Sequence, residues 1–258
     1  MVLLFFKIWY GYCGDLMSNN IKMELKYLVK LLIVFFLFFF SSYLQFIPVI
    51  LFRIKKVDGT VSVFLNSFSN IVLLIILIII YRKDLVREWK TFKSNTWRNV
   101  DIGIKSWLVG LLGMMIFNII LNNLFKANGA TNEQAVQKMI TAFPWLMLVN
   151  GGITGPFIEE IVFRKAFKDV FKTKWLFIIF SGVVFGLMHV VSSFTSFSNF
   201  LYFIPYSCLG IAFCYAYYIT DSIYTSAFLH IFHNTSLILL SILLWEKKEK
   251  VLIINLNY

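Results

Sequence analysis

The feature that most constrains this chain is a series of apolar runs, each long enough to cross a bilayer. The hydrocarbon core of a bilayer is about 30 Å thick, which a helix of about 20 apolar residues spans. Such runs occupy residues 31–52, 61–81, 104–125, 139–171, 175–191, 199–219 and 222–244. Hydrophobic residues make up 59% of the chain and charged residues 14%, against about 45–50% and 25% in soluble domains. We therefore predict an all-α fold, a polytopic transmembrane helical bundle of about seven spans.

The net charge of +11 would suit a nucleic-acid-binding protein, but the positions of the charges favour another explanation. Lys and Arg residues lie mainly between the apolar runs, where they orient a membrane protein with its basic side in the cytoplasm. The larger share falls in segments 22–30, 82–105 and 164–174, which share one side if the N-terminus is cytoplasmic. We predict a multi-pass integral membrane protein with a cytoplasmic N-terminus, contacting membrane lipid and no nucleic acid.

The chain divides into four parts by composition. Residues 1–27 form an N-terminal segment of uncertain start, whose apolar stretch is too short to span and lacks the pattern of a signal peptide. Residues 28–135 form N-terminal transmembrane helices, 136–245 form a core that carries the unusual polar groups, and 246–258 form a basic C-terminal tail. The oligomeric state is not predicted.

Ionisable side chains within the apolar runs indicate a functional site. An Asp inside a span costs at least about 2.5–3.5 kcal/mol on insertion scales, so each such residue needs a reason. The adjacent acids Glu159 and Glu160 lie inside a run, and so do all three histidines, His189, His230 and His233. We expect His233 to serve helix packing and the others to form a site.

Helix geometry places two of these groups at one depth. Glu159 and His189 lie about equally far from the basic turn at residues 172–174, roughly 20 Å at about 1.5 Å per residue. An antiparallel pair of helices therefore brings them to the same level.

Residues four apart share a helix face, and two such pairs flank this level. Glu160 and Arg164 can form an ion pair that fixes the helix presenting Glu159, although the pair is equally compatible with a purely structural role. His230 and Asn234 point an imidazole and an amide in the same direction.

The positions of several glycines also indicate a site in the region of Glu159 and His189. Gly182 and Gly186 form a small-xxx-small pair that lets another helix approach the helix of His189. The Gly-Gly and Gly-Pro pairs within 151–156 predict a break or kink before the acid pair. In a membrane, irregular backbone persists where it is buried in protein or lines a water-filled cavity.

These residue types suit hydrolysis of a peptide bond. Glu159 can act as a general base toward water, with His189 holding the same water or passing the proton. His230 and Asn234 can donate hydrogen bonds to the oxyanion that forms when water attacks a carbonyl.

A metal-dependent alternative uses the same positions. Glu159, His189 and His230 together resemble a catalytic zinc set with water in the open position. The His-Glu-x-x-His pattern of soluble zinc proteases is absent from the sequence.

Three motifs resemble those of the CPBP family, the CAAX proteases and bacteriocin-processing enzymes. They are Glu159-Glu160-Ile-Val-Phe-Arg164 for EExxxR, Phe185-Gly-Leu-Met-His189 for FxxxH, and His230-Ile-Phe-His-Asn234 for HxxxN. The resemblance covers about residues 140–240 and makes 136–245 a CPBP-like catalytic core. It implies an intramembrane protease of the type II CAAX prenyl endopeptidase kind, with Glu159 as the water-activating base. It further implies that His189 assists, that His230 and Asn234 bind the oxyanion, and that no cofactor is needed.

The sequence thus predicts an intramembrane endopeptidase of the bacterial plasma membrane. Its substrate would be a membrane-associated peptide or protein precursor, such as a peptide pheromone, a bacteriocin or a CAAX-like protein. Two other classes stay open. A noncatalytic immunity or scaffold protein would keep its function without Glu159, and a transporter would need inverted repeats or a second polar span, which are not found.

Overall fold

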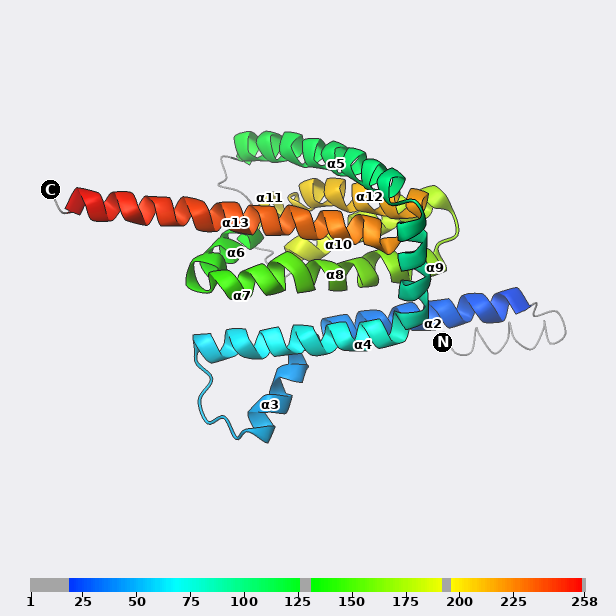
Figure 1. Cartoon of the computed structure of the whole chain (residues 1–258), viewed down its shortest axis with the longest axis horizontal. Coiled ribbons are helices and arrows are strands. Elements are labelled where there is room, and N and C mark those ends of the chain that lie inside the picture. Colours follow the sequence, from blue (N-terminus) through cyan, green and yellow to red (C-terminus); the bar gives the residue numbers. More distant parts are fainter. Residues whose placement is uncertain (1–18, 126–130, 192–195, 257–258) are drawn as a thin grey trace.

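The computed structural model describes residues 19–125, 131–191 and 196–256, and within them every regular element is a helix (Figure 1). In this part of the chain, six helices are long and apolar enough to cross a membrane, or up to seven if a bent pair counts as one span. The predicted all-α, multi-pass membrane architecture is confirmed. Most of the predicted N-terminal segment 1–27 and the last residues of the tail 246–258 lie outside the described residues.

The elements follow one another without any intervening strand in the described ranges. In chain order they are α2 (Asn19–Phe39), η1 (Ser41–Gln45), α3 (Phe46–Leu51), α4 (Gly59–Ser94), α5 (Thr96–Phe125), α6 (Thr131–Ala142), α7 (Pro144–Val149), η2 (Asn150–Thr154), α8 (Gly155–Glu159), η3 (Glu160–Lys165), α9 (Ala166–Val170), α10 (Lys174–Val191), α11 (Phe197–Phe200), α12 (Phe203–Thr220) and α13 (Ile223–Leu256). The short element η1 is a 3₁₀ turn, whereas η2 and η3 are π-helical.

The first predicted span, 31–52, is not one straight helix. Segments Glu24–Phe39 and Ser41–Leu51 meet at an angle of 52°. Ser41 lies at the joint, where its hydroxyl donates to the carbonyl of Phe38 (2.8 Å). Such local bonds compete with the regular helix and often accompany bends.

The break expected within 139–171 takes another form. Segment Pro144–Val170 is a continuous apolar span, and the irregularity consists of two π-helical turns on either side of α8. A π turn adds a residue without ending the helix, and such turns are frequent at functional sites. Gly155 permits the first one, because a Cβ there would lie 2.8 Å from the carbonyl oxygen of Asn150.

Close helix packing at glycines confirms the small-xxx-small prediction for α10. A Cβ on Gly182 would lie 2.6 Å from the backbone nitrogen of Ile211, and one on Gly186 would lie 2.5 Å from the carbonyl oxygen of Phe203. Helix α12 therefore packs directly on the helix that carries His189, and it also packs extensively against α5.

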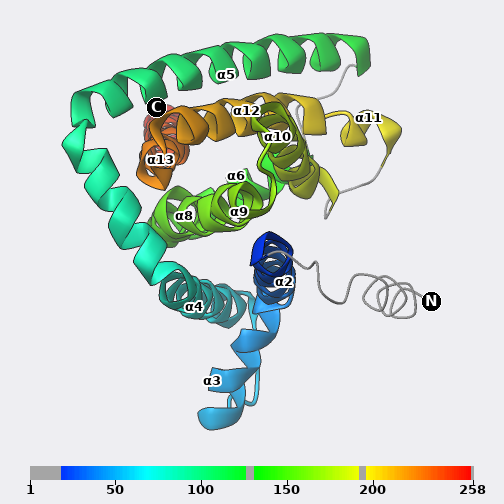
Figure 2. The same cartoon turned by 90° about the vertical axis from the view of Figure 1, so that its right-hand side faces the viewer.

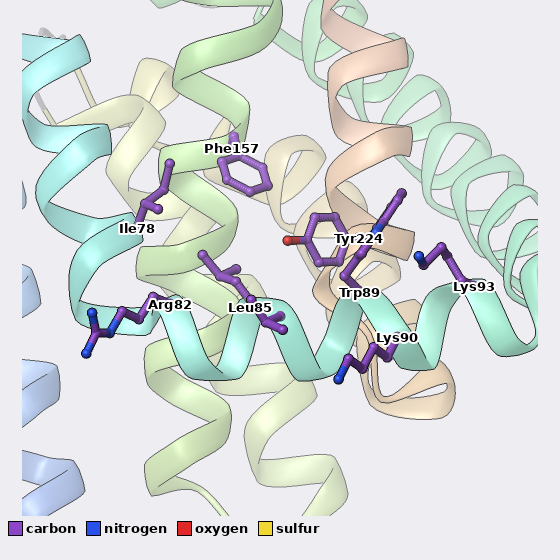
Figure 3. A pocket seen from close by; sticks show the side chains of 9 residues that line it. Ile78, Arg82, Leu85, Trp89, Lys90, Lys93, Phe157 and Tyr224 are labelled. Carbon is purple, nitrogen blue, oxygen red and sulfur yellow. The ribbon is translucent and has the colours of Figure 1, made fainter.

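Helix α4 changes direction near Arg82 (Figure 3). Its first part runs alongside the other spans, whereas the remainder, residues 82–94, lies across their ends and leads to α5 (Figures 1 and 2). We call residues 82–94 the transverse segment. The predicted span 61–81 thus corresponds to the first part of α4, and the basic stretch that follows it lies along the transverse segment.

Glu88 anchors the transverse segment to α13. Its carboxylate accepts hydrogen bonds from the backbone N–H of Ile223 (2.9 Å) and from the hydroxyl of Tyr217 (3.1 Å). Its backbone carbonyl accepts one from the hydroxyl of Ser222 (2.9 Å). A carboxylate at a helix N-terminus satisfies free N–H groups and complements the helix dipole. The sequence analysis did not single out Glu88, which is buried.

Basic residues gather at the end of the bundle where the transverse segment lies. The start of α2, the end of α9 and the start of α10 share that end, whereas α4 begins at the opposite end (Figure 1). Two residues counted among the basic residues of this side are buried, Arg164 and Lys165. The carboxylate partner of Arg164 is also buried, and Lys165 is paired with Asp169 (2.6 Å). The side of the membrane to which this end belongs stays a prediction.

Candidate active site

Two adjacent glutamates meet one histidine in the interior of the bundle. Glu159 ends α8 and Glu160 begins the π-helical η3, while His230 lies on α13. Nδ1 of His230 is 2.9 Å from Oε1 of Glu160, and Nε2 is 3.7 Å from Oε2 of Glu159. Because an ionised carboxylate can only accept, the imidazole donates through Nδ1 to Glu160. Its Nε2 is then presented toward Glu159.

Glu160 is enclosed by further partners. Its Oε1 lies 3.4 Å from Nε of Arg164, and both side chains are 0% exposed. The guanidinium of Arg164 lies over the ring of Phe185, 4.0 Å from its centroid, and 5.7 Å from that of Phe213. A buried charge is tolerated when it is paired, and aromatic faces add attraction for a cation. Glu160 and Arg164 together thus join η3 to α13 and to α10.

Glu159 differs from Glu160 in its access. The side chain of Glu159 is 25% exposed, compared with 0% for Glu160. The Oε2 atoms of Glu159 and Glu160 are both buried and have no hydrogen-bond partner within the described part of the chain. Of the two side chains, only that of Glu159 is therefore partly open to water or a ligand.

Asn234 joins α13 to the first π turn. Its side-chain amide donates to the carbonyl of Gly151 (3.1 Å), and the hydroxyl of Thr235 donates to that of Gly152 (3.1 Å). One of the two amide protons of Asn234 is therefore engaged, and one can serve a ligand. The predicted side-chain direction did not anticipate this bond, because the bond depends on carbonyls presented by the π turn.

His189 lies beside the glutamate–histidine cluster without direct contact to Glu159. Its Nδ1 is 2.9 Å from the carbonyl of Phe185, and its ring stacks on Tyr206 with centroids 4.6 Å apart. The Phe185 ring touches both His189 and His230, with centroid distances of 4.4 and 5.6 Å. No hydrogen bond or ion pair joins His189 to Glu159 in the structure as described. Phe185 thus links His189 to the cluster, while the shared level of Glu159 and His189 stays a prediction.

His233 contacts helix α5. Its Nδ1 accepts a hydrogen bond from the indole N–H of Trp107 on α5 (3.3 Å). This contact fits the packing role predicted for it.

The alternative zinc set is not assembled. Within the residues that the structure describes, no group of three or more His, Cys, Asp or Glu side chains is placed to hold a metal ion. Glu159, His189 and His230 therefore do not match the compact tetrahedral arrangement of a zinc site in this conformation.

Comparison with known proteins agrees with the position of the site. Residues 141–236 match the family model described as "Type II CAAX prenyl endopeptidase Rce1-like", and this stretch contains all three motifs. This stretch is thus similar to a CPBP-family domain. It is 31% identical over 114 residues to a Bacillus subtilis (strain 168) protein named "Putative membrane peptidase YdiL", a match that covers 43% of each chain. The chain thus matches less than half the length of that relative. No solved structure matches it significantly.

Several neighbours of the histidines were missed from the sequence. The sequence analysis did not single out Tyr206 as part of the site, but it stacks on His189. Phe213 was not singled out, and its ring stacks on that of His230 with centroids 5.0 Å apart. Both residues lie on α12. The close approach permitted by Gly182 and Gly186 was the only signal that α12 would border the site.

Proposed function

We propose that this protein is an intramembrane endopeptidase with Glu159 as the general base. One observation carries the proposal: adjacent carboxylates share one imidazole, yet only Glu159 is partly accessible. A paired, enclosed Glu160 suits a positioning role, and an accessible carboxylate suits proton transfer. The match to a prenyl endopeptidase family model supports peptide-bond hydrolysis.

The proposed reaction begins with water held between Glu159 and a substrate carbonyl. Glu159 takes one proton while the water oxygen bonds to the carbonyl carbon, which converts the carbonyl oxygen to an oxyanion. The second amide proton of Asn234 can donate to this oxyanion, as can Nε2 of His230 when it is protonated. Glu159 then returns its proton to the leaving nitrogen as the C–N bond breaks, which yields an acid and an amine.

The substrate is proposed from the location of the site. Glu159 and His230 lie within apolar spans, so a scissile bond reaches them most readily from a segment already associated with the membrane. Peptide pheromone precursors, bacteriocin precursors and CAAX-like proteins are the candidate classes. We place the protein in a bacterial plasma membrane with a cytoplasmic N-terminus, and we propose that it needs no metal.

The test is cleavage of membrane-associated peptides by purified full-length protein. Glu159→Gln should lower the rate by about 10²–10⁴-fold, the usual contribution of a general base. Asp101→Asn is the matched control, because it makes the same carboxylate-to-amide change at an exposed position paired only with Lys105. The control should cleave like wild type, and a strong chelator should have no effect.

Other outcomes would point elsewhere. Undiminished cleavage by Glu159→Gln would refute the assigned base. Loss on chelation with recovery on adding zinc would favour the metal-dependent alternative. If cells expressing Glu159→Gln keep full resistance to a peptide that wild type protects against, the noncatalytic immunity alternative would be favoured.

A further inference from the structure

A pocket separate from the glutamate–histidine cluster lies under the transverse segment. It has a volume of about 380 Å³ and is bordered by α4, α8 and α13 (Figure 3). This volume falls within the range of about 300–1,000 Å³ typical of small-ligand sites. Its residues are Ile78, Arg82, Leu85, Val86, Trp89, Lys90, Lys93, Phe157 and Tyr224.

The inner wall of the pocket is aromatic and aliphatic. The rings of Trp89 and Tyr224 meet edge to face with centroids 4.9 Å apart, and the ring of Phe157 lies 6.2 Å from that of Tyr224. Leu85 is buried beneath them. A small hydrophilic anion would find few hydrogen-bond donors on this wall, whereas a hydrocarbon chain would be well accommodated.

The outer edge of the pocket is cationic. Arg82, Lys90 and Lys93 are exposed, and none of them forms an ion pair with a described carboxylate. By contrast, Arg87 on the same segment is paired with Asp84 (3.0 Å). Long basic side chains place their aliphatic stems along apolar surface and their charges in water. The pocket thus combines an apolar interior with three uncompensated positive charges.

The transverse segment lies where lipid headgroups are expected. It crosses the ends of the spans (Figures 1 and 2), and tryptophan and lysine are typical of the membrane–water interface. We propose that this pocket binds an anionic phospholipid. The headgroup phosphate is attracted to the basic edge formed by Arg82, Lys90 and Lys93, and part of an acyl chain enters between Trp89, Phe157 and Tyr224. The site is independent of the proposed peptidase activity.

Quenching of Trp89 fluorescence by brominated lipid tests this site directly. Full-length protein is reconstituted in phosphatidylcholine vesicles containing a fixed fraction of brominated phosphatidylglycerol or brominated phosphatidylcholine. The Trp89→Phe variant gives the signal of the other tryptophans. We expect the relative affinity measured at Trp89 to favour the anionic lipid by about tenfold or more, because basic residues near the surface attract anionic headgroups.

Two variants that lose the same number of positive charges test whether the basic residues of the pocket cause the preference for anionic lipid. Arg82→Gln/Lys90→Gln/Lys93→Gln should abolish the preference. Lys26→Gln/Lys83→Gln/Arg98→Gln removes the same charge at exposed positions outside the pocket and should retain it. Equal quenching by the two lipids in wild type, or an unchanged preference in the first variant, would overturn the proposal. Reversal of the quenching by inorganic phosphate would also overturn it, because the site would then bind a free anion.

Discussion

At the scale of single residues, the two adjacent glutamates of one motif have different surroundings. One turn of their helix is π-helical, and a histidine from far along the chain contacts them. Glu160 is fixed by Arg164 at 3.4 Å and by His230 at 2.9 Å. Glu159 keeps an accessible side chain beside the same imidazole. The buried pair thus orients the histidine toward Glu159, the proposed general base.

Arg164→Leu tests the buried charge pair. We expect it to lower the free energy of unfolding by about 3–5 kcal/mol, because Glu160 is left buried without its cation. Adding Glu160→Gln should recover a substantial part of this loss. Denaturant unfolding in detergent micelles measures both. Lys105→Leu is the control, since Lys105 and its partner Asp101 are both exposed and surface pairs contribute about 0–1 kcal/mol. A double variant no more stable than Arg164→Leu would argue against the charge pair as the cause.

Pairing within one helix could be predicted from the sequence, but pairing between spans could not. Spacing along single helices predicted the Glu160–Arg164 contact, which the structure confirms. The hydrogen bond from His230 to Glu160 joins residues in different spans, so no local pattern encodes it. The catalytic roles of Glu159, His189, His230 and Asn234 stay predictions.

At the scale of elements, the helices carrying the three motifs are held together by backbone contacts as much as by side chains. Helix α10 packs on α12 through glycines, and α13 joins the first π turn through Asn234 and Thr235. Close backbone approach is the usual means of tight helix association in membranes. These contacts leave little room for larger residues.

Gly186→Ala probes the closest of these approaches. The added methyl would lie 2.5 Å from the carbonyl oxygen of Phe203 and 2.7 Å from the nitrogen of Ser207. We expect destabilisation of about 1–3 kcal/mol, typical of overpacking, measured as a lower thermal midpoint. At Gly59 no atom lies within 4 Å of such a methyl, so Gly59→Ala should change stability by less than about 0.5 kcal/mol. Equal effects of the two substitutions would contradict the packing explanation.

The presence of the membrane-spanning helices could be predicted from hydropathy, whereas their bends could not. The apolar run 61–81 correctly indicated the first part of α4, but no Gly or Pro near Arg82 signals the change of direction. The transverse segment takes its course from tertiary anchors such as Glu88, which lies far in sequence from the residues it contacts.

At the scale of the whole molecule, the basic residues at one end predict the orientation in the membrane. With the three cysteines replaced, single cysteines introduced as Lys172→Cys and Lys55→Cys report opposite ends of the bundle. We expect a membrane-impermeant maleimide to label Lys55→Cys on intact cells and Lys172→Cys only after permeabilisation, in line with the positive-inside rule. The reverse pattern would place the N-terminus outside.

The contact between Glu88 and the start of α13 affects whether the stretch matched by the family model can be transferred to another protein by itself. Glu88 lies outside residues 141–236, the stretch matched by the family model, yet it supplies acceptors for Ile223 and Ser222 at the beginning of the helix that carries His230. A graft of the matched stretch into another membrane scaffold would leave that helix end without its cap. A chimera between relatives would therefore need to transfer the transverse segment together with the motifs.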